Sequence, residues 1–220
     1  MQCIKDTIKN INIVIGCSIG CSYCYARMNN NRFHTIDDFN KPVFFENKLK
    51  MLDNKRHTAY LLTGQSDLSG WNEEWKDKVF SKMKENENTQ YIFLTKRPEN
   101  INLKETPDNG WFGVTVTSSK EKTRIDYLRN NIKAKHYHIT FEPMFDDVGK
   151  LDLSNISWIV IGTETGNRKG KISSKREWVF NIYNQAKEKN IPVFMKEDLL
   201  GILNEDEFVQ EFPKEFGGIK

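Results

Sequence analysis

The sequence has few cysteines, no long apolar run and no strong excess of charge. Only 4 of its 220 residues are cysteine, too few for the disulfide framework of a small secreted protein. No apolar stretch approaches the roughly 20 residues that cross a bilayer, and the first residues lack the apolar core of a signal peptide. A formal net charge of +3 does not by itself indicate nucleic-acid binding. We therefore expect a cytoplasmic protein that does not enter a membrane.

Linkers and low-complexity tracts are also missing. The chain of 220 residues is long enough to bury one sizeable core. No stretch rich in proline, glycine and serine divides it. We therefore expect residues 1–220 to form a single domain.

The scarce cysteines are concentrated in one loop. Cys17, Cys21 and Cys24 lie in the run CSIGCSYC, directly after the β-branched segment 11–15 and Gly16. Three thiolates on one loop suit a single metal centre, and an iron–sulfur cube held by three cysteines keeps one iron open for another ligand. An open coordination position is typical of reactive metal sites rather than structural ones. The pattern favours a 4Fe-4S centre that follows a first strand.

A zinc site is the alternative. His34 or Cys3 could supply a fourth ligand, and zinc would then stabilise a non-catalytic binding module. Modules of that kind commonly pair two closely spaced cysteine motifs, whereas this chain has one. We rank the zinc module below the open cluster.

Strand-like and helix-like patterns alternate along the rest of the chain. Short β-rich apolar runs occur at 59–63, 91–95, 111–117, 137–142, 158–163 and 191–196. Segments with apolar residues three to four positions apart lie at 42–52, 74–85, 119–131 and 174–189. This alternation predicts βαβ units with parallel strands, and the chain is shorter than a complete eight-unit barrel usually is. We predict an α/β fold, a partial (β/α)6-type barrel, that is, a truncated TIM barrel with parallel strands.

The predicted strands end on polar or ionisable residues. In parallel α/β folds the carboxyl ends of the strands meet at one rim, which is where active sites form. Side chains two residues apart on a strand share a face. On this basis the upper interior of the barrel is polar if two sets of residues point inward: Gly113, Thr115 and Thr117, and His138, Thr140 and Glu142.

The spacing C-x3-C-x2-C, with Tyr23 before the last cysteine, resembles the signature of the radical S-adenosylmethionine (SAM) superfamily. The resemblance implies that Cys17, Cys21 and Cys24 hold a 4Fe-4S cluster, that SAM chelates the open iron, and that Tyr23 lies beside the adenine. It also implies an oxygen-sensitive enzyme with a partial barrel, and a one-electron reductant such as flavodoxin or ferredoxin as partner.

From residue 64 onward the chain also resembles one radical SAM group that is common in phages and mobile elements. The matching strings are SDL at 66–68, LTKRP at 94–98, WFGVTV at 111–116, RIDYL at 124–128, FEPM at 141–144, WIVIGTETG at 158–166 and PVFMK at 192–196. They cover most of the chain. The resemblance supports the fold and the cofactor but implies no particular substrate.

Five residues at the predicted rim suit the polar groups of SAM: Ser66, Asp67, Thr117, Arg124 and Glu142. The first three are short hydrogen-bonding groups for the ribose hydroxyls and the amino group, Arg124 would offset the carboxylate, and Glu142 would face the sulfonium or amino portion. Ordinary ion pairs are the alternative, for Arg124 with Glu121 or Asp126, and for Glu142 with a cation of the fold.

The substrate is indicated only by charge. Lys96, Arg97 and the loop 166–176, which includes Arg168 and carries five cations and no anion, are expected at the rim. They would attract an anionic ligand, with stacking surfaces from Trp71, Trp111 or Phe145. A merely solvated basic loop is the alternative.

We therefore expect a radical SAM enzyme that cleaves SAM reductively to a 5'-deoxyadenosyl radical, which abstracts hydrogen from a substrate. Two substrate classes remain open. One is nucleic acid or another polyanion, and the other is a small molecule, as in the similarly short 7-carboxy-7-deazaguanine synthases.

Overall fold

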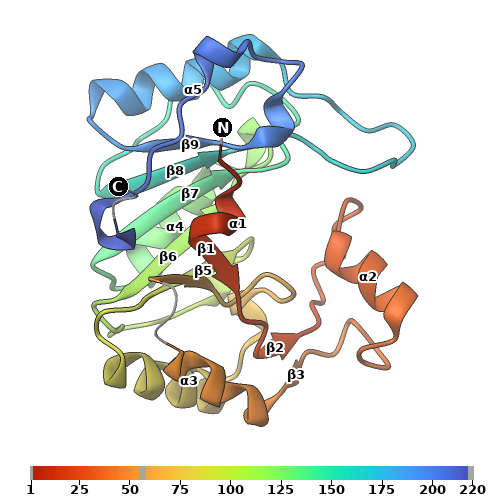
Figure 1. The fold of residues 1–220 in the computed structure, drawn as a ribbon, viewed down its shortest axis with the longest axis vertical. Helices are drawn as coiled ribbons and strands as arrows, with labels where there is room; N and C mark the ends of the chain where they lie inside the picture. Colours follow the sequence, from red (N-terminus) through yellow and green to blue (C-terminus); the bar gives the residue numbers. More distant parts are fainter. Residues whose placement is uncertain (1, 55–57, 218–220) are drawn as a thin grey trace.

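The computed structural model describes residues 2–54 and 58–217, and its centre is a parallel sheet of seven strands (Figure 1). Neighbouring strands pair in the order β1-β4-β5-β6-β7-β8-β9, and every pair is parallel. The sheet curls into a half-barrel, so the predicted partial TIM-type barrel is confirmed. The strands are β1 Ile8–Asn10, β4 Ala59–Leu61, β5 Gln90–Thr95, β6 Gly110–Thr115, β7 His136–Phe141, β8 Ile156–Ile161 and β9 Val193–Met195.

Three helices, α3 Glu73–Glu85, α4 Thr123–Asn131 and α5 Arg176–Glu188, pack against the outer face of this sheet. The other two α-helices, α1 Ile4–Thr7 and α2 Tyr25–Phe33, lie elsewhere. Apolar residues at helical spacing, such as Val179, Ile182 and Ala186 of α5, are buried in the main core together with one face of the strands. The two longest helices, α3 and α5, have 13 residues each, and no described helix has the length and apolarity needed to span a membrane.

Short 3₁₀ helices occupy many of the connections. They are Glu46–Asp53, Leu68–Gly70, Pro98–Asn100, Ser119–Glu121, Glu197–Leu199, Glu205–Glu207 and Lys214–Phe216. Three of the four predicted helices correspond to α3, to the 3₁₀ turn with α4, and to α5. The helix predicted at 42–52 is wrong in its first half, because Val43–Phe44 forms the strand β3, and the remainder is a 3₁₀ helix.

The strand before the cysteine loop also differs from the prediction. Within the segment 11–15 only Val14–Ile15 is a strand, β2, and it pairs antiparallel with β3 outside the half-barrel. The first parallel strand is β1, which pairs with β4. Ile11, Ile13 and Val14 are buried. Their apolar side chains fit a barrel strand and a small packed two-stranded sheet equally well, and sequence alone does not separate these two arrangements.

The half-barrel has an aromatic lower interior and a polar upper interior. Phe112 and Val114 of β6 belong to the core beneath the helices, whereas Trp111 belongs to a second cluster inside the curl with Trp158 and Phe216. By period two, Gly113 and Thr115 share the inner face with Trp111. An added Cβ at Gly113 would lie 2.4 Å from the His138 ring, so the two inner faces meet. The predicted polar interior is confirmed.

The C-terminal segment closes the aromatic end of the curl. The Phe216 ring lies 4.8 Å from the Trp111 ring and 5.3 Å from the Trp158 ring, both edge-on. In Figure 1 this segment lies at the opposite end of the sheet from α2. The half-barrel is therefore packed at one end and opens at the carboxyl ends of its strands. We call that open end the mouth.

Candidate active site

The cysteine loop, residues 17–24, connects β2 to α2, and the loop and α2 both lie between the paired strands β2 and β3 in the chain. Gly16 begins it with φ 113°, and a side chain there would lie 2.9 Å from the Pro42 Cα atom, so the position requires glycine. The Gly16 N–H donates to the Gln65 carbonyl oxygen at 3.0 Å, which ties the start of the loop to the segment after β4. The end of the loop is Cys24, the N-cap of α2, whose Sγ accepts from the Arg27 N–H at 3.4 Å.

Side chains of α2 fix the cysteine loop. The Arg27 guanidinium donates to the Cys17 carbonyl oxygen at 2.9 Å and lies 5.0 Å from the centre of the Phe39 ring. Buried Asn30 donates to and accepts from the backbone of Ile36, which fixes the chain as it returns from the helix. These bonds satisfy backbone groups that would otherwise be left without partners, so the loop has a defined path.

All four cysteines are free and partly exposed. Burial raises the pKa of the Cys17 thiol to about 11, and the negative charges of Asp67, Cys21 and Cys24 act in the same direction. Within residues 2–54 and 58–217, no three Cys, His, Asp or Glu side chains are gathered as they would be around a metal ion. Cys3 and His34, the two candidate fourth ligands for zinc, likewise belong to no such group among these residues. The Cys3 thiol instead donates to the Glu197 carboxylate at 3.0 Å.

The cysteine loop lies against the mouth. The Tyr25 hydroxyl donates to the Gly64 carbonyl oxygen at 2.5 Å. Burial raises the pKa of Tyr25, and the charge of Glu142 adds to this effect, so the start of α2 lies near the end of β7. Tyr23 packs edge-on against Phe145, with 5.4 Å between the ring centres, and its ring lies 5.9 Å from the Lys96 Nζ. Three strand ends thus converge on this loop.

Asp67 and Ser66 are already engaged within the protein. Asp67 is buried, and its carboxylate accepts from the Ser69 N–H and hydroxyl, the Thr95 hydroxyl and the Lys96 N–H at 2.6–3.0 Å. Ser66 Oγ accepts from the Trp71 indole N–H at 3.0 Å. The Asp67 carboxylate therefore fixes the β4 and β5 ends beside the mouth, and its four bonds leave it little capacity for a ligand.

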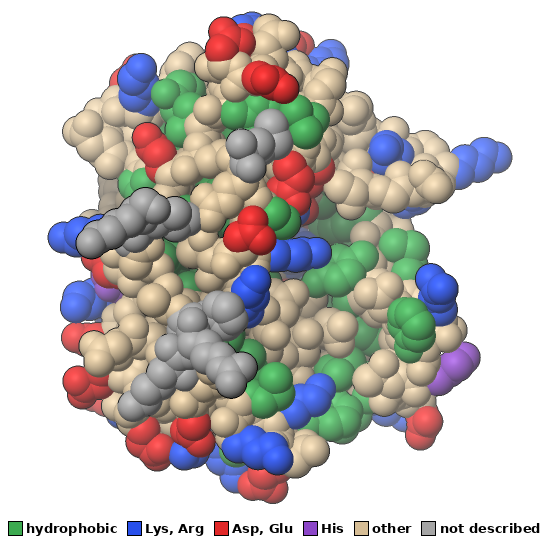
Figure 2. Space-filling view, in the orientation of Figure 1, with side chains coloured by type: hydrophobic (Ala, Val, Ile, Leu, Met, Phe, Trp, Pro, Cys, Tyr) green, Lys and Arg blue, Asp and Glu red, His purple; other side chains and the backbone are tan. Residues whose placement is uncertain are grey.

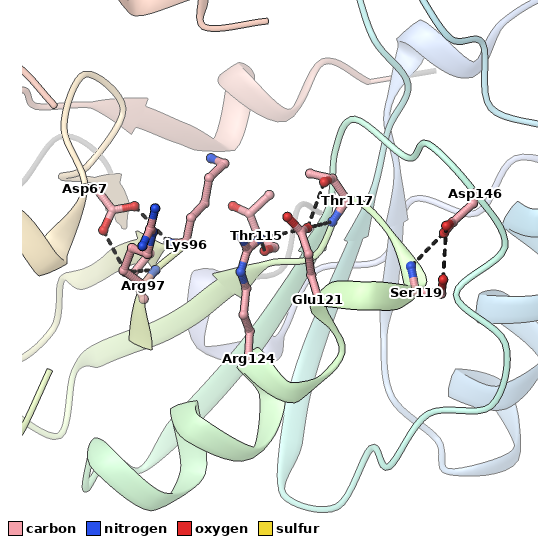
Figure 3. A network of polar contacts seen from close by, with 10 residues as sticks. Asp67, Lys96, Arg97, Thr115, Thr117, Ser119, Glu121, Arg124 and Asp146 are labelled. Atoms are coloured by element: carbon pink, nitrogen blue, oxygen red, sulfur yellow. Dashed lines mark hydrogen bonds and ion pairs between the residues drawn. The ribbon is translucent and has the colours of Figure 1, made fainter. Parts of the chain in front are cut away.

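Thr117, Glu121 and Arg124 form one network after β6 (Figure 3). One Glu121 carboxylate oxygen accepts from the Thr117 N–H and hydroxyl at 2.7 Å and lies 2.8 Å from Arg124 Nη1. The same Arg124 nitrogen donates to the Thr115 carbonyl oxygen at 2.7 Å. The ion pair between Arg124 and Glu121, considered above as the alternative for Arg124, is present. Sequence reasoning did not assign Glu121 to the site, although its spacing from Arg124 on one helical turn was a usable signal.

The sequence did not predict a second pair of hydrogen bonds beside this network, between Ser119 and Asp146. Ser119 donates from its N–H and its hydroxyl to the two Asp146 carboxylate oxygens, at 2.6 Å and 3.0 Å (Figure 3). This clamp joins the segment after β6 to the segment after β7. Nothing local in the sequence pairs two residues 27 positions apart.

Glu142 pairs with Lys196 across β8. The Lys196 ammonium contacts the Glu142 carboxylate and lies 3.4 Å from the Asp198 carboxylate. Burial opposes the charge on Lys196, but the two carboxylates outweigh it and raise its pKa. Burial raises the pKa of Asp198 to about 6. A Cβ at Gly162 would lie 3.2 Å from both acids, so glycine leaves room for them. The structural ion pair considered for Glu142 is therefore present, and the pair faces Tyr25.

Arg168 is neutralised in its own loop. Its guanidinium forms two bonds to the buried Glu164 carboxylate, at 2.5 Å and 2.8 Å. Lys96 and Arg97 differ from it, because neither has a carboxylate within ion-pair distance in the described part of the chain. Of the three rings considered as stacking surfaces, Trp71 and Trp111 are buried, which corrects that expectation, and only Phe145 is partly exposed.

His138 lies below the mouth and supports a pH prediction. Its Nε2–H donates to the Phe93 carbonyl oxygen at 3.1 Å, and its Nδ1 is buried without a partner in the described chain. Burial lowers the pKa of His138 from 6.5 to about 4. Between these pH values the unfolded chain binds a proton and the folded chain does not, so stability falls as pH falls through this window.

We expect the His138 contribution to unfolding free energy to drop by about 2 kcal/mol between pH 7 and pH 5. Urea unfolding at both pH values measures this drop in unfolding free energy. His138→Gln should remove it. The control His34→Gln, at the exposed end of α2, should leave it unchanged. An equal pH dependence in the wild-type protein and His138→Gln would contradict the assignment.

Comparison with known proteins gives one match. Searches of curated proteins and of solved structures found no match. A family model described as "Protein of unknown function (DUF5131)" matches residues 2–217. Because the match spans nearly the whole sequence, this chain belongs to the DUF5131 family.

Proposed function

We propose that this protein is a radical SAM enzyme. One observation carries the proposal: three free cysteines on one short loop stand against the carboxyl-end mouth of a parallel half-barrel. Active sites of parallel α/β barrels form at that end. The resemblance of the CSIGCSYC run to the superfamily signature supports the same function.

The donor set suits a 4Fe-4S cluster with an open iron. Cys17, Cys21 and Cys24 would hold it, since thiolates are the ligands that iron–sulfur clusters use. The loop would have to draw its sulfurs together on binding, and Gly20, with φ 77° and no atom within 4 Å of an added Cβ, gives the backbone room to adjust. When bound with SAM, such a cluster supplies the electron that cleaves SAM to a 5'-deoxyadenosyl radical.

The residues of the mouth would bind and orient SAM. Thr115 and Thr140 point into the upper interior, and their hydroxyls have no protein partner among the described residues, unlike Ser66 and Thr117. They are therefore the hydroxyls best able to bond the ribose. Tyr23 would cover the adenine, and Glu142 would face a cationic group of SAM with Lys196 fixing its orientation.

The lower interior would protect the radical. Trp111, Trp158 and Phe216 fill the half-barrel below the polar layer and keep water from entering at that end. Water exclusion prevents a reactive intermediate from being quenched. We propose the reducing cytoplasm as the compartment, and a flavodoxin- or ferredoxin-type protein as the electron donor.

Anaerobic reconstitution tests the proposal. Protein reconstituted with iron and sulfide should be brown, contain about four irons per chain, and release 5'-deoxyadenosine from SAM after reduction with dithionite. One zinc per chain, no colour and no SAM cleavage would contradict the proposal and favour the zinc-stabilised module.

A further inference from the structure

Four cations at the mouth have no carboxylate partner among residues 2–54 and 58–217. Lys96 and Arg97 follow β5, and Lys169 and Lys171 lie in the loop after β8. No carboxylate of the described chain lies within ion-pair distance of any of the four, in contrast to Arg168. Such charges remain available to a ligand, because a partner carboxylate would have to be displaced first.

The loop that carries Lys169 and Lys171 has a defined conformation. The buried Glu164 carboxylate accepts from Arg168 and from the Ile172 N–H, and the Ser174 N–H donates to the Thr163 hydroxyl at 3.0 Å. The loop therefore folds back on the end of β8. Figure 1 shows it projecting beyond the sheet on the side where α2 lies, and Figure 2 shows cationic side chains on the projection.

Helix α2 presents an apolar and aromatic stripe on the same side of the molecule. Tyr25, Met28 and Phe33 are 52%, 56% and 65% exposed. No acidic residue occurs between positions 7 and 36. Figure 2 shows hydrophobic side chains gathered around α2 below the projecting loop. Exposed rings and unpaired cations on one side of the molecule are the combination that binds both the bases and the phosphates of a nucleic acid strand.

We propose that a single-stranded nucleic acid binds across the mouth, with phosphates on Lys96, Arg97, Lys169 and Lys171 and bases against the α2 stripe. A duplex fits less well, because its bases are stacked inside and cannot cover exposed rings. An acidic protein would use the cations but has less need for free ring faces. The inference rests on the proposed function, since the bound strand would carry the hydrogen that the radical abstracts.

Fluorescence anisotropy with labelled oligonucleotides tests the inference. The full-length protein, both as purified and after reconstitution, is titrated with a 20-nucleotide DNA strand, an RNA strand of the same sequence, and the DNA duplex. We expect at least ~10-fold tighter binding of a single strand than of the duplex, and a log–log salt slope near −3 for four phosphate contacts. The DNA and RNA strands show which sugar the protein prefers.

Matched variants locate the surface. Phe33→Ala should weaken single-strand binding about 10-fold, whereas Tyr127→Ala, an exposed ring on α4, should not. Lys169→Ala with Lys171→Ala should reduce the magnitude of the salt slope by about 1 to 1.5. Lys104→Ala with Lys133→Ala, exposed cations before β6 and β7 at the other end of the sheet, should leave the slope unchanged.

Glu164→Gln distinguishes binding that requires the defined conformation of this loop from binding by net positive charge alone. The substitution raises the net charge, so simple attraction predicts tighter binding, whereas release of Arg168 and the loop predicts at least ~3-fold weaker binding. Circular dichroism confirms that the variant is folded. If the position of the loop controls binding, Arg168→Gln should weaken binding in the same way.

Equal affinity for duplex and single strand, or unchanged affinity in Phe33→Ala, would overturn the inference and leave the α2 stripe as a protein-binding surface. These binding measurements require neither iron nor SAM. SAM cleavage, in turn, is measured without oligonucleotide. Failure of the nucleic-acid inference is therefore distinguishable from failure of the proposed function.

Discussion

Cys21→Ser is expected to abolish SAM cleavage, with a loss of at least about 1,000-fold. A serine hydroxyl does not replace a thiolate as a ligand of an iron–sulfur cluster. The variant should bind less iron after anaerobic reconstitution and should lose the brown colour. Iron content, the visible absorption spectrum and the yield of 5'-deoxyadenosine measure the effect, and we expect the same result for Cys17→Ser and Cys24→Ser.

Cys3→Ser is the matched control. Cys3 lies outside the loop and donates to Glu197, an acceptor that a serine hydroxyl also satisfies. This variant should keep its iron and its SAM cleavage. If Cys3→Ser lost iron to the same extent as Cys21→Ser, or if Cys21→Ser kept its activity, the assignment of the cluster to the loop would be wrong.

Phe216→Ala should lower the free energy of unfolding by about 3–5 kcal/mol. The ring is 1% exposed and packs edge-on against Trp111 and Trp158, so its removal leaves a cavity inside the half-barrel that surrounding aromatic rings cannot fill. Urea-induced unfolding followed by tryptophan fluorescence measures the change, and both indoles should report it.

Leu200→Ala provides the comparison for Phe216→Ala. Leu200 is 50% exposed, and its truncation should change stability by less than about 0.5 kcal/mol. A loss below about 1 kcal/mol for Phe216→Ala would mean that the C-terminal segment does not close the aromatic end of the half-barrel.

The sequence predicted most of the parallel sheet, for a simple physical reason. Strands of a parallel sheet are buried on both faces, so their residues form short continuous apolar runs. All six residues of β6 and all three of β9 are buried; β9 lies within a predicted run, and β6 begins one residue before one. Helices α3 and α5 were predictable because their apolar residues recur at helical spacing along one face.

Residues near the cysteine loop were harder to predict. The 42–52 segment has a helix-like spacing, but Val43 and Phe44 pair with Ile15 and Val14. That pairing depends on a partner strand 28 or more residues away, and local spacing does not contain it. Trp71 and Trp111 show the same limit, because the sequence does not distinguish an aromatic side chain that faces the mouth from one that is buried in the core.

By itself the sequence determined the chemistry available to this protein. It supplied three thiols on one loop, the alternation that yields a parallel α/β half-barrel, and ionisable residues at the strand ends. Local spacing and residue type are sufficient for these features, because ligand chemistry and secondary-structure period are properties of short segments.

The tertiary structure decided which of those residues remain free. Asp67 forms hydrogen bonds to partners that the curled sheet brings close, and Arg168 pairs with a carboxylate in its own folded loop. The Lys96 ammonium and the inner Thr140 hydroxyl have no such hydrogen-bond partner among the described residues. A polar group buried by folding must find a partner or lose several kcal/mol. Which groups are consumed in this way, and which still face the mouth, therefore depends on the packing of segments that lie far apart in the chain.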